Sequence, residues 1–319
     1  MRSVPNEVCP RWSAGQQFAG KNALQVGNEE IIMIKSLSFW IFVLPAFFVL
    51  SLVVLIPFGM GIYYSFTSWT GVGSNVTYVG FANFSRLLSD VPARESLVFT
   101  FRFTFTVVIL SNVIGLILAL GLVEPIRFSG PLRVVFFLPN VIGGLILGFI
   151  WRFIFIQGLP AIGRVTGIGL FQIPWLGDGV TGFWGLVIVF VWRTAGYLTV
   201  IYVAALLSVD KGLSESAQID GANYLQRLFH IQIPMIMPAF TVCIFLMLSW
   251  AFRVFDIVFS LTNGGPFRST EVFALNIYNE AFVFNNFGYG SAKAVVFFII
   301  VAFMTLIQVK ITKGKEIAL

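Results

Sequence analysis

The residues best suited to chemistry are aromatic and charged side chains inside two long apolar stretches. They are Trp192, Arg193 and Tyr197 in one stretch, and Trp250, Arg253 and Asp256 in the other. A charge at membrane depth costs about 3 kcal/mol or more, so it must snorkel, pair or face a wet cavity. The aromatic faces could stack on the rings of a polar solute while the charged groups hydrogen-bond its hydroxyls. A structural alternative is equally open, because Arg253 and Asp256 are three apart and could pair on one helix.

Two further arginines, Arg102 and Arg152, lie nearer the ends of apolar stretches. We interpret both as snorkelling to the membrane surface.

The composition places these residues in a membrane protein. Of 319 residues, 58% are hydrophobic and 11% are charged, and the mean hydropathy is +0.91, which excludes a soluble domain. The net charge of +6 indicates neither nucleic acid nor an acidic substrate, because basic residues in such a protein mostly record topology. Two cysteines, Cys9 and Cys243, and one histidine, His230, predict no disulfide framework and no metal site.

Six apolar stretches have the length of about 20 residues that a bilayer core of about 30 Å requires. They lie near 39–64, 97–122, 132–156, 181–208, 237–260 and 292–310. The fold class predicted is an all-α integral membrane protein with six transmembrane helices. Pro45 and Pro57 predict a kink in the first span.

The distribution of basic residues orients the spans. Eleven Lys and Arg residues fall in the segments 1–38, 123–133, 209–236 and 308–319, against four in the alternate loops, at Arg86, Arg94, Arg164 and Arg268. Both termini and the segment 209–236 are therefore predicted to be cytoplasmic.

The cytoplasmic segment 209–236 has the features of a short docking helix. Ser214 can cap it, Glu215 would then occupy the first turn, Gly221 permits a bend, and Pro234 stops regular structure before the next span. The alternative, an ordinary amphipathic connector, is open on composition alone.

The order of residues in this segment resembles a known motif. Glu215-Ser216-Ala217, Asp220-Gly221-Ala222, Phe229, Ile231, Ile233-Pro234 and Pro238 resemble the EAA loop of ATP-binding-cassette importer permeases, on which the ATPase subunit pushes. Ser216 departs from the usual alanine but remains small. The resemblance implies ATPase coupling by Glu215, Ser216, Ala217, Asp220, Gly221, Ala222 and Pro234.

Shorter matches over residues 37–310 resemble the binding-protein-dependent carbohydrate-uptake permeases of the maltose and glycerol-phosphate type. They are Ser65-Phe66-Thr67-Ser68-Trp69, Leu138-Pro139, Trp151, Leu261-Thr262-Asn263-Gly264-Gly265-Pro266 and Gly288-Tyr289-Gly290-Ser291-Ala292. The resemblance implies the type I importer permease fold. It also implies a sugar pathway drawn from the fourth and fifth spans, and so favours a pathway role for the six residues named first.

The chain lacks its own energy source. Its nearest approach to a phosphate-binding loop, residues 158–165, has neither the lysine nor the following hydroxyl residue. The chain is therefore predicted to be no enzyme and to bind no cofactor, with ATP and Mg held by a partner ATPase. The resemblance implies a second homologous permease subunit as heterodimer partner, two ABC ATPase subunits and an extracytoplasmic solute-binding protein, in the cytoplasmic membrane of a prokaryote.

Two alternatives are open. One is an importer permease for a non-sugar solute, against which the motif at 261–266 argues. The other is an ATP-independent secondary transporter, whose inverted repeats we do not find. A membrane enzyme is disfavoured because no nucleophile with a base, and no metal-ligand set, is evident.

We expect four regions along the chain. Residues 1–36 form a disordered cytoplasmic tail, with Met33 a candidate for the true start, and 37–92 hold the first span and an outer loop. Residues 93–310 form the core permease domain, and 311–319 a cytoplasmic tail. The outer segments 65–96 and 157–180 should be ordered loops, whose aromatics form either an interfacial belt or a docking surface.

Overall fold

The computed structural model describes residues 40–123 and 129–314, and in these the chain forms two compact units, Met1–Met60 and Gly61–Leu319. The predictions for the tail 1–36, including Met33 and Cys9, lie outside the described residues. So do those for 124–128 and 315–319.

The described part of the first unit is helical and coincides with the predicted first span. The helix covers Trp40–Ser65, so that its last five residues belong to the second unit, and it contains a π-helical turn η1 (Ser51–Leu55) followed by α2 (Ile56–Ser65). Within the chain, none of the 18 most apolar consecutive residues of this helix is buried. A helix that is apolar on all sides requires a lipid or protein environment.

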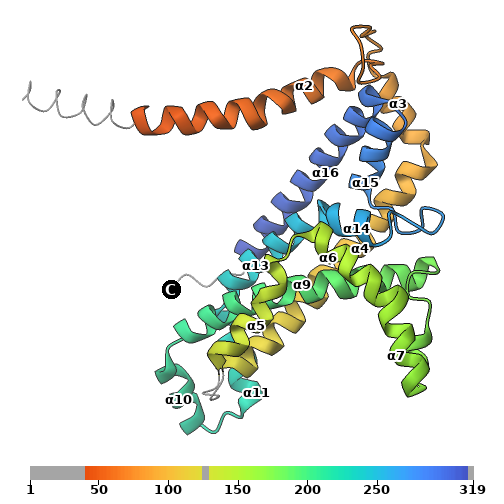
Figure 1. Ribbon diagram of the computed structural model, residues 1–319. Helices are drawn as coiled ribbons and strands as arrows, with labels where there is room; N and C mark the ends of the chain where they lie inside the picture. The colour runs from red at the N-terminus through yellow and green to blue at the C-terminus, as the bar shows by residue number, and fades with distance from the viewer. Residues whose placement is uncertain (1–39, 124–128, 315–319) are drawn as a thin grey trace, which may run out of the picture. The chain divides into compact units, whose positions relative to one another are not determined.

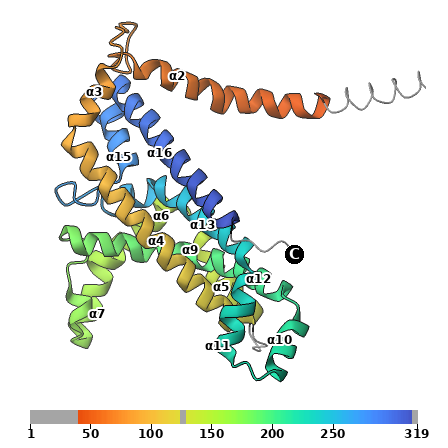
Figure 2. The same cartoon turned by 180° about the vertical axis from the view of Figure 1, so that it is seen from behind.

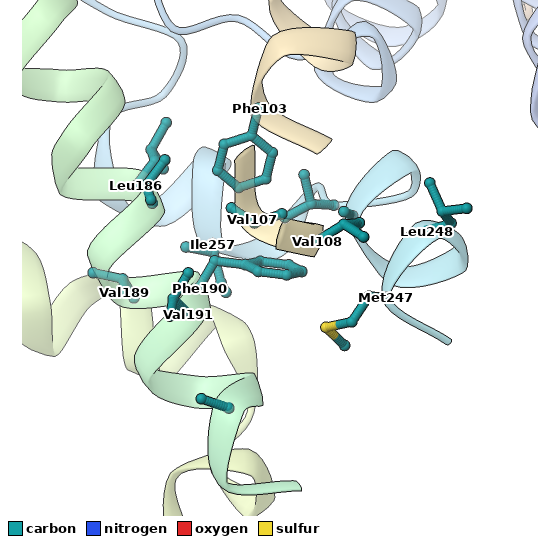
Figure 3. Packing of buried hydrophobic residues seen from close by; sticks show 14 of the residues in the cluster. Phe103, Val107, Val108, Leu186, Val189, Phe190, Val191, Met247, Leu248 and Ile257 are labelled. Atoms are coloured by element: carbon teal, nitrogen blue, oxygen red, sulfur yellow. The ribbon is translucent and has the colours of Figure 1, made fainter. Parts of the chain in front are cut away.

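The second unit is built on two long helices, α4 (Val91–Val123) and α9 (Gly179–Ser208), which pack along each other. Phe103 and Val107 of α4 meet Phe190 of α9 and Ile257 in the buried core (Figure 3). Two buried hydrogen bonds join the pair. Ser111 Oγ lies 2.9 Å from Thr194 Oγ1, and the Tyr202 hydroxyl donates to Asn112 Oδ1 over 2.6 Å. Polar bonds between helices inside a membrane fix their register.

The remaining helices surround this pair (Figure 1). They are α3 (Ala82–Ser89), α5 (Ser129–Val141), α6 (Gly144–Phe153), η2 (Ile154–Gly158), α7 (Leu159–Thr166), α8 (Gly169–Gln172), α10 (Lys211–Ile219), α11 (Tyr224–Arg227), η3 (Leu228–Gln232), α12 (Ile233–Met235), α13 (Met237–Phe252), α14 (Asp256–Leu261), α15 (Phe273–Tyr278), η4 (Asn279–Val283) and α16 (Phe287–Lys313). The α10–α11 end and the α3–α15 end lie at opposite extremes of this unit in both views (Figure 2). The described residues hold no strand, only an isolated bridge between Thr67 and Tyr78.

Among the described residues, five helices are long and apolar enough to cross a membrane. The bent pair Tyr224–Met235 and Met237–Phe252, whose axes differ by 69°, gives a sixth crossing if it is counted as one span. The count agrees with the six predicted spans. The bounds of the third span are wrong, because the chain breaks at Ile142-Gly143 and the crossing helix is Gly144–Thr166. The fifth predicted span is also broken: α13 ends at Phe252 and α14 starts at Asp256.

Candidate functional site

The breaks in the third and fifth predicted spans lie against each other. A Cβ atom placed on Gly144, the first residue of α6, would lie 1.7 Å from Asp256 Oδ2. One placed on Gly148 would lie 1.9 Å from Ser260 Oγ. Only glycine admits this approach, so α6 and α14 pack through a small-residue face, as helices in membranes commonly do.

Asp256 links this junction to α9. Its Oδ2 lies 3.5 Å from Nη1 of Arg193, and its Oδ1 accepts from the Ile257 backbone N–H over 2.9 Å. The alternative left open by the sequence, a pair of Arg253 with Asp256 on one helix, therefore does not form. The helix ends at Phe252, and the Arg253 Nε donates instead to the Ser249 carbonyl over 2.9 Å.

A cavity of about 500 Å³ opens at the junction. It is lined by Asn140, Phe190, Arg193, Thr194, Trp250, Arg253, Val254 and Asp256. Two guanidinium groups donate, a carboxylate accepts, and the Asn140 amide does both. With the Trp250 ring beside them, these groups can hold a hydroxylated ring by its polar edge and its apolar face.

Four of the six predicted pathway residues line this cavity: Arg193, Trp250, Arg253 and Asp256. Tyr197 lies behind it, with its ring centroid 5.2 Å from that of Trp250. Trp192 does not belong to the group, because it packs against Trp151 at 5.4 Å and lines a separate apolar cavity.

Sequence reasoning missed the two other polar lining residues, Asn140 and Thr194. Asn140 directly follows the Leu138-Pro139 match, and Thr194 adjoins Arg193. Their neighbours were therefore the available signal.

The first helix of the segment 209–236 starts one helical turn earlier than predicted. Asp210, and not Ser214, caps α10, accepting from the Gly212 N–H over 2.8 Å, so Glu215 lies in the second turn. Gly221 closes the helix at a φ of +86°, a conformation that favours glycine. The Ala222 N–H donates to the Ala217 carbonyl over 2.9 Å across this turn, which confirms the predicted bend at Gly221.

A second short helix, α11, returns beside α10. Asn223 and Gln226 form a reciprocal capping box, and Arg227 Nη1 donates to Gln218 Oε1 of α10 over 2.8 Å. A cavity of about 440 Å³ lies between the helices, bordered by Asp220, Gly221, Ala222, Gln226, Arg227, His230 and Ile231. Pro234 does not end the helical structure as predicted, since α12 continues to Met235 and the bend falls at Ile236.

The segment also presents apolar side chains outward. Ile219 is 86% exposed, and Leu213, Tyr224, Leu225 and Phe229 are also exposed. These exposed apolar side chains and the adjacent cavity form a surface suited to binding another protein.

A buried ion cluster at the α3–α15 end was not foreseen. Lys293 is 1% exposed, and its Nζ donates to Glu280 Oε2 over 2.8 Å and lies 3.0 Å from Asp90 Oδ2. The Tyr289 hydroxyl donates to the same Asp90 oxygen over 2.6 Å. A lysine in the second turn of an apolar span was the available signal.

The cluster gives the match at 288–292 a structural reason. A Cβ on Gly288 would lie 2.1 Å from the Thr67 carbonyl oxygen, so glycine allows the start of α16 to pack closely against the loop that follows the first span.

Burial raises the pKa of Asp90, but hydrogen bonds from Tyr289, the Ala93 N–H and Lys293 outweigh this effect and hold the pKa below its usual range.

No group of three or more His, Cys, Asp or Glu residues able to hold a metal ion occurs in the part of the chain that the structure describes.

The chain is similar to known transport proteins. Residues 111–315 match the family described as "Binding-protein-dependent transport system inner membrane component". A probable starch degradation products transport system permease of Thermoanaerobacterium thermosulfurigenes is 44% identical over 88% of this chain and 95% of its own. A multiple sugar-binding transport system permease of Streptococcus mutans is 32% identical over 82% of this chain and 90% of its own.

One solved structure shares the fold. A chain of a bacterial ABC transporter that imports the acidic polysaccharide alginate aligns with a TM-score of 0.79 at 18% identity, over 90% of this chain and 99% of its own.

Proposed function

The chain belongs to the family of binding-protein-dependent transport system inner membrane components, and on that premise we propose that it is a permease subunit of an ATP-driven sugar importer. Its apolar helices make it a multi-pass membrane protein. Relatives named for starch degradation products, for multiple sugars and for trehalose and maltose support sugar as the solute class.

The observation that carries this proposal is the cavity where the two helix breaks meet. Irregular backbone at membrane depth is tolerated where it is buried in protein or lines a water-filled cavity, and transporters place their solute sites at such breaks. Arg193, Arg253 and Asp256 supply hydrogen bonds to hydroxyls, and Trp250 supplies the stacking face. Tyr197 positions Trp250, whereas nothing supports a pathway role for Trp192.

The segment 209–236 couples this cavity to a separate ATPase, which binds ATP and Mg. Its coupling residues are Glu215, Ser216, Ala217, Asp220, Gly221, Ala222 and Pro234. Because α11, η3 and α12 lead into α13, a push on α10 and α11 moves the helix that ends at Phe252, next to Arg253. That motion would switch the cavity between inward and outward access.

The complete importer has further subunits. These are a second homologous permease in a heterodimer, two ABC ATPase subunits and an extracytoplasmic solute-binding protein. The complex resides in the cytoplasmic membrane of a prokaryote, with both termini of this chain in the cytoplasm, and this chain itself has no enzymatic role.

The test is sugar-stimulated ATP hydrolysis by the reconstituted complex in liposomes, screened against a carbohydrate panel. We expect stimulation by one sugar and its loss in Gly221→Val, because a β-branched residue cannot adopt the φ of +86°. Gly167→Val is the matched control, since Gly167 also ends a helix at positive φ, at +71°, but lies between α7 and α8.

Three outcomes would contradict the proposal in different ways. Full stimulation in Gly221→Val would exclude the coupling role. An ATP-competent complex that responds to no sugar would indicate another solute class. A chain that associates with no ATPase would favour a secondary transporter.

A further inference from the structure

Two cavities meet along the groove between α4 and α9, away from the proposed solute cavity. The inner one, of about 520 Å³, lies between α4, α5 and α9, and all its lining residues are apolar, among them Leu118 and Phe136. The outer one, of about 610 Å³, is lined by charged and polar groups as well as aromatic ones. Trp184 lines both, so the two chambers adjoin at that residue.

The outer chamber holds one positive and one negative side chain. The Arg102 guanidinium lies 5.8 Å from the Phe183 ring centre and has no ion-pair partner among the residues that the structure describes. Asp178 uses its Oδ1 to cap α9, accepting from Val180 N–H over 2.7 Å and Thr181 N–H over 2.9 Å. These backbone bonds lower the pKa of Asp178, so it is a carboxylate at neutral pH.

The dimensions match one leaflet of a membrane. Along α4, Arg102 and Leu118 are about 24 Å apart at a rise of 1.5 Å per residue. One leaflet with its headgroup region is about 20 to 22 Å thick. A polar chamber with a free cation therefore stands where headgroups lie, and an apolar chamber stands where acyl chains lie. Trp184 marks the boundary, as interfacial tryptophans do.

We propose that this groove binds one zwitterionic aminophospholipid, with its phosphate at Arg102, its ammonium group at Asp178 and its acyl chains in the apolar chamber. The charge pattern selects this occupant. An anionic phospholipid such as phosphatidylglycerol would satisfy Arg102 with its phosphate but would offer Asp178 no cation. A protein helix would have to cover both chambers with matching charges.

The test is native mass spectrometry of the full chain, purified in mild detergent with its partner permease and titrated with phosphatidylethanolamine or phosphatidylglycerol. We expect one phosphatidylethanolamine per chain, held more tightly than phosphatidylglycerol. Arg102→Gln should weaken both lipids about tenfold or more, the effect of losing one charge-assisted hydrogen bond. Asp178→Asn retains the helix cap and should weaken phosphatidylethanolamine alone.

Arg152→Gln is the control, because Arg152 is an exposed arginine on α6 that borders neither chamber. Equal retention in the wild type and both chamber variants would overturn the proposal. So would a preference for phosphatidylglycerol, or a wild-type complex without bound lipid, which would show that the partner permease fills the groove. Each of these outcomes is a measurement of bound lipid and is independent of sugar transport.

Discussion

Removal of the buried Lys293 should destabilise the α3–α15 end of the second unit. In Lys293→Met, two carboxylates lose the ammonium group that lies 2.8 Å from Glu280 and 3.0 Å from Asp90. The side chains of both acids are nearly buried, at 10% and 14% exposure. Arg86, 3.7 Å from Glu280, is 56% exposed and compensates little.

The magnitude follows from the burial. Removing one partner of a buried ion pair costs about 3 to 5 kcal/mol, because the other charge is left uncompensated. Asp90 accepts from the Ala93 N–H at the start of α4, and Glu280 accepts from Asn286, so the loss should reach α4, η4 and the start of α16 together.

The assay is chemical unfolding in detergent micelles, followed by tryptophan fluorescence. Lys310→Met is the matched control, since Lys310 is exposed on the same helix, and it should change the unfolding free energy by less than about 0.5 kcal/mol. The triple variant Lys293→Met, Asp90→Asn, Glu280→Gln should regain most of the loss, because none of the three replaced side chains is then charged.

A single variant that loses less than about 1 kcal/mol would refute the reasoning. So would a triple variant no more stable than the single one, because the cost would then arise from packing and not from uncompensated charge.

Two further predictions concern the helix junction and acid stability. Gly144→Val should displace Asp256, separate it from Arg193 and reduce sugar-stimulated ATP hydrolysis at least about tenfold. Gly143→Ala is the control and should retain this activity, because a Cβ at Gly143 meets nothing within 4 Å. Equal activities of the two variants would exclude the junction from the pathway. The lowered pKa of Asp90 means that its carboxylate stabilises the fold above its ordinary value of 3.8 and that this contribution is lost as the pH falls through the lower folded-state value. The free energy of unfolding, measured from pH 7 to pH 3, should therefore fall less steeply for Asp90→Asn than for the wild type. Identical slopes would show that Asp90 does not contribute to the pH dependence of stability.

The sequence by itself determined the membrane class, the number of crossings and the family. Stretches of about 20 apolar residues must form helices in a bilayer, because the backbone has no other hydrogen-bond partners there. The bend at Gly221 was also predictable, because glycine tolerates positive φ, and the spacing of Glu215, Ala217 and Gly221 carried the family resemblance.

Only the tertiary structure decided where the crossings break and which polar residues meet. The break before Asp256 lies in a mostly apolar stretch without glycine or proline at the break, and it is stabilised by Gly144 and Arg193 from two other helices. Local periodicity left a pair between Arg253 and Asp256 open, and it gave no sign that Trp192 and Trp250 line different cavities.

The ion cluster shows the same limit. Lys293 is held by Asp90, about two hundred positions earlier in the chain, and by Glu280 in a separate helical segment. A buried charge is stabilised by groups that packing brings to it, and their distance along the chain gives no local pattern. The sequence therefore predicts which segments enter the membrane, and helix packing decides which of their charged side chains form pairs.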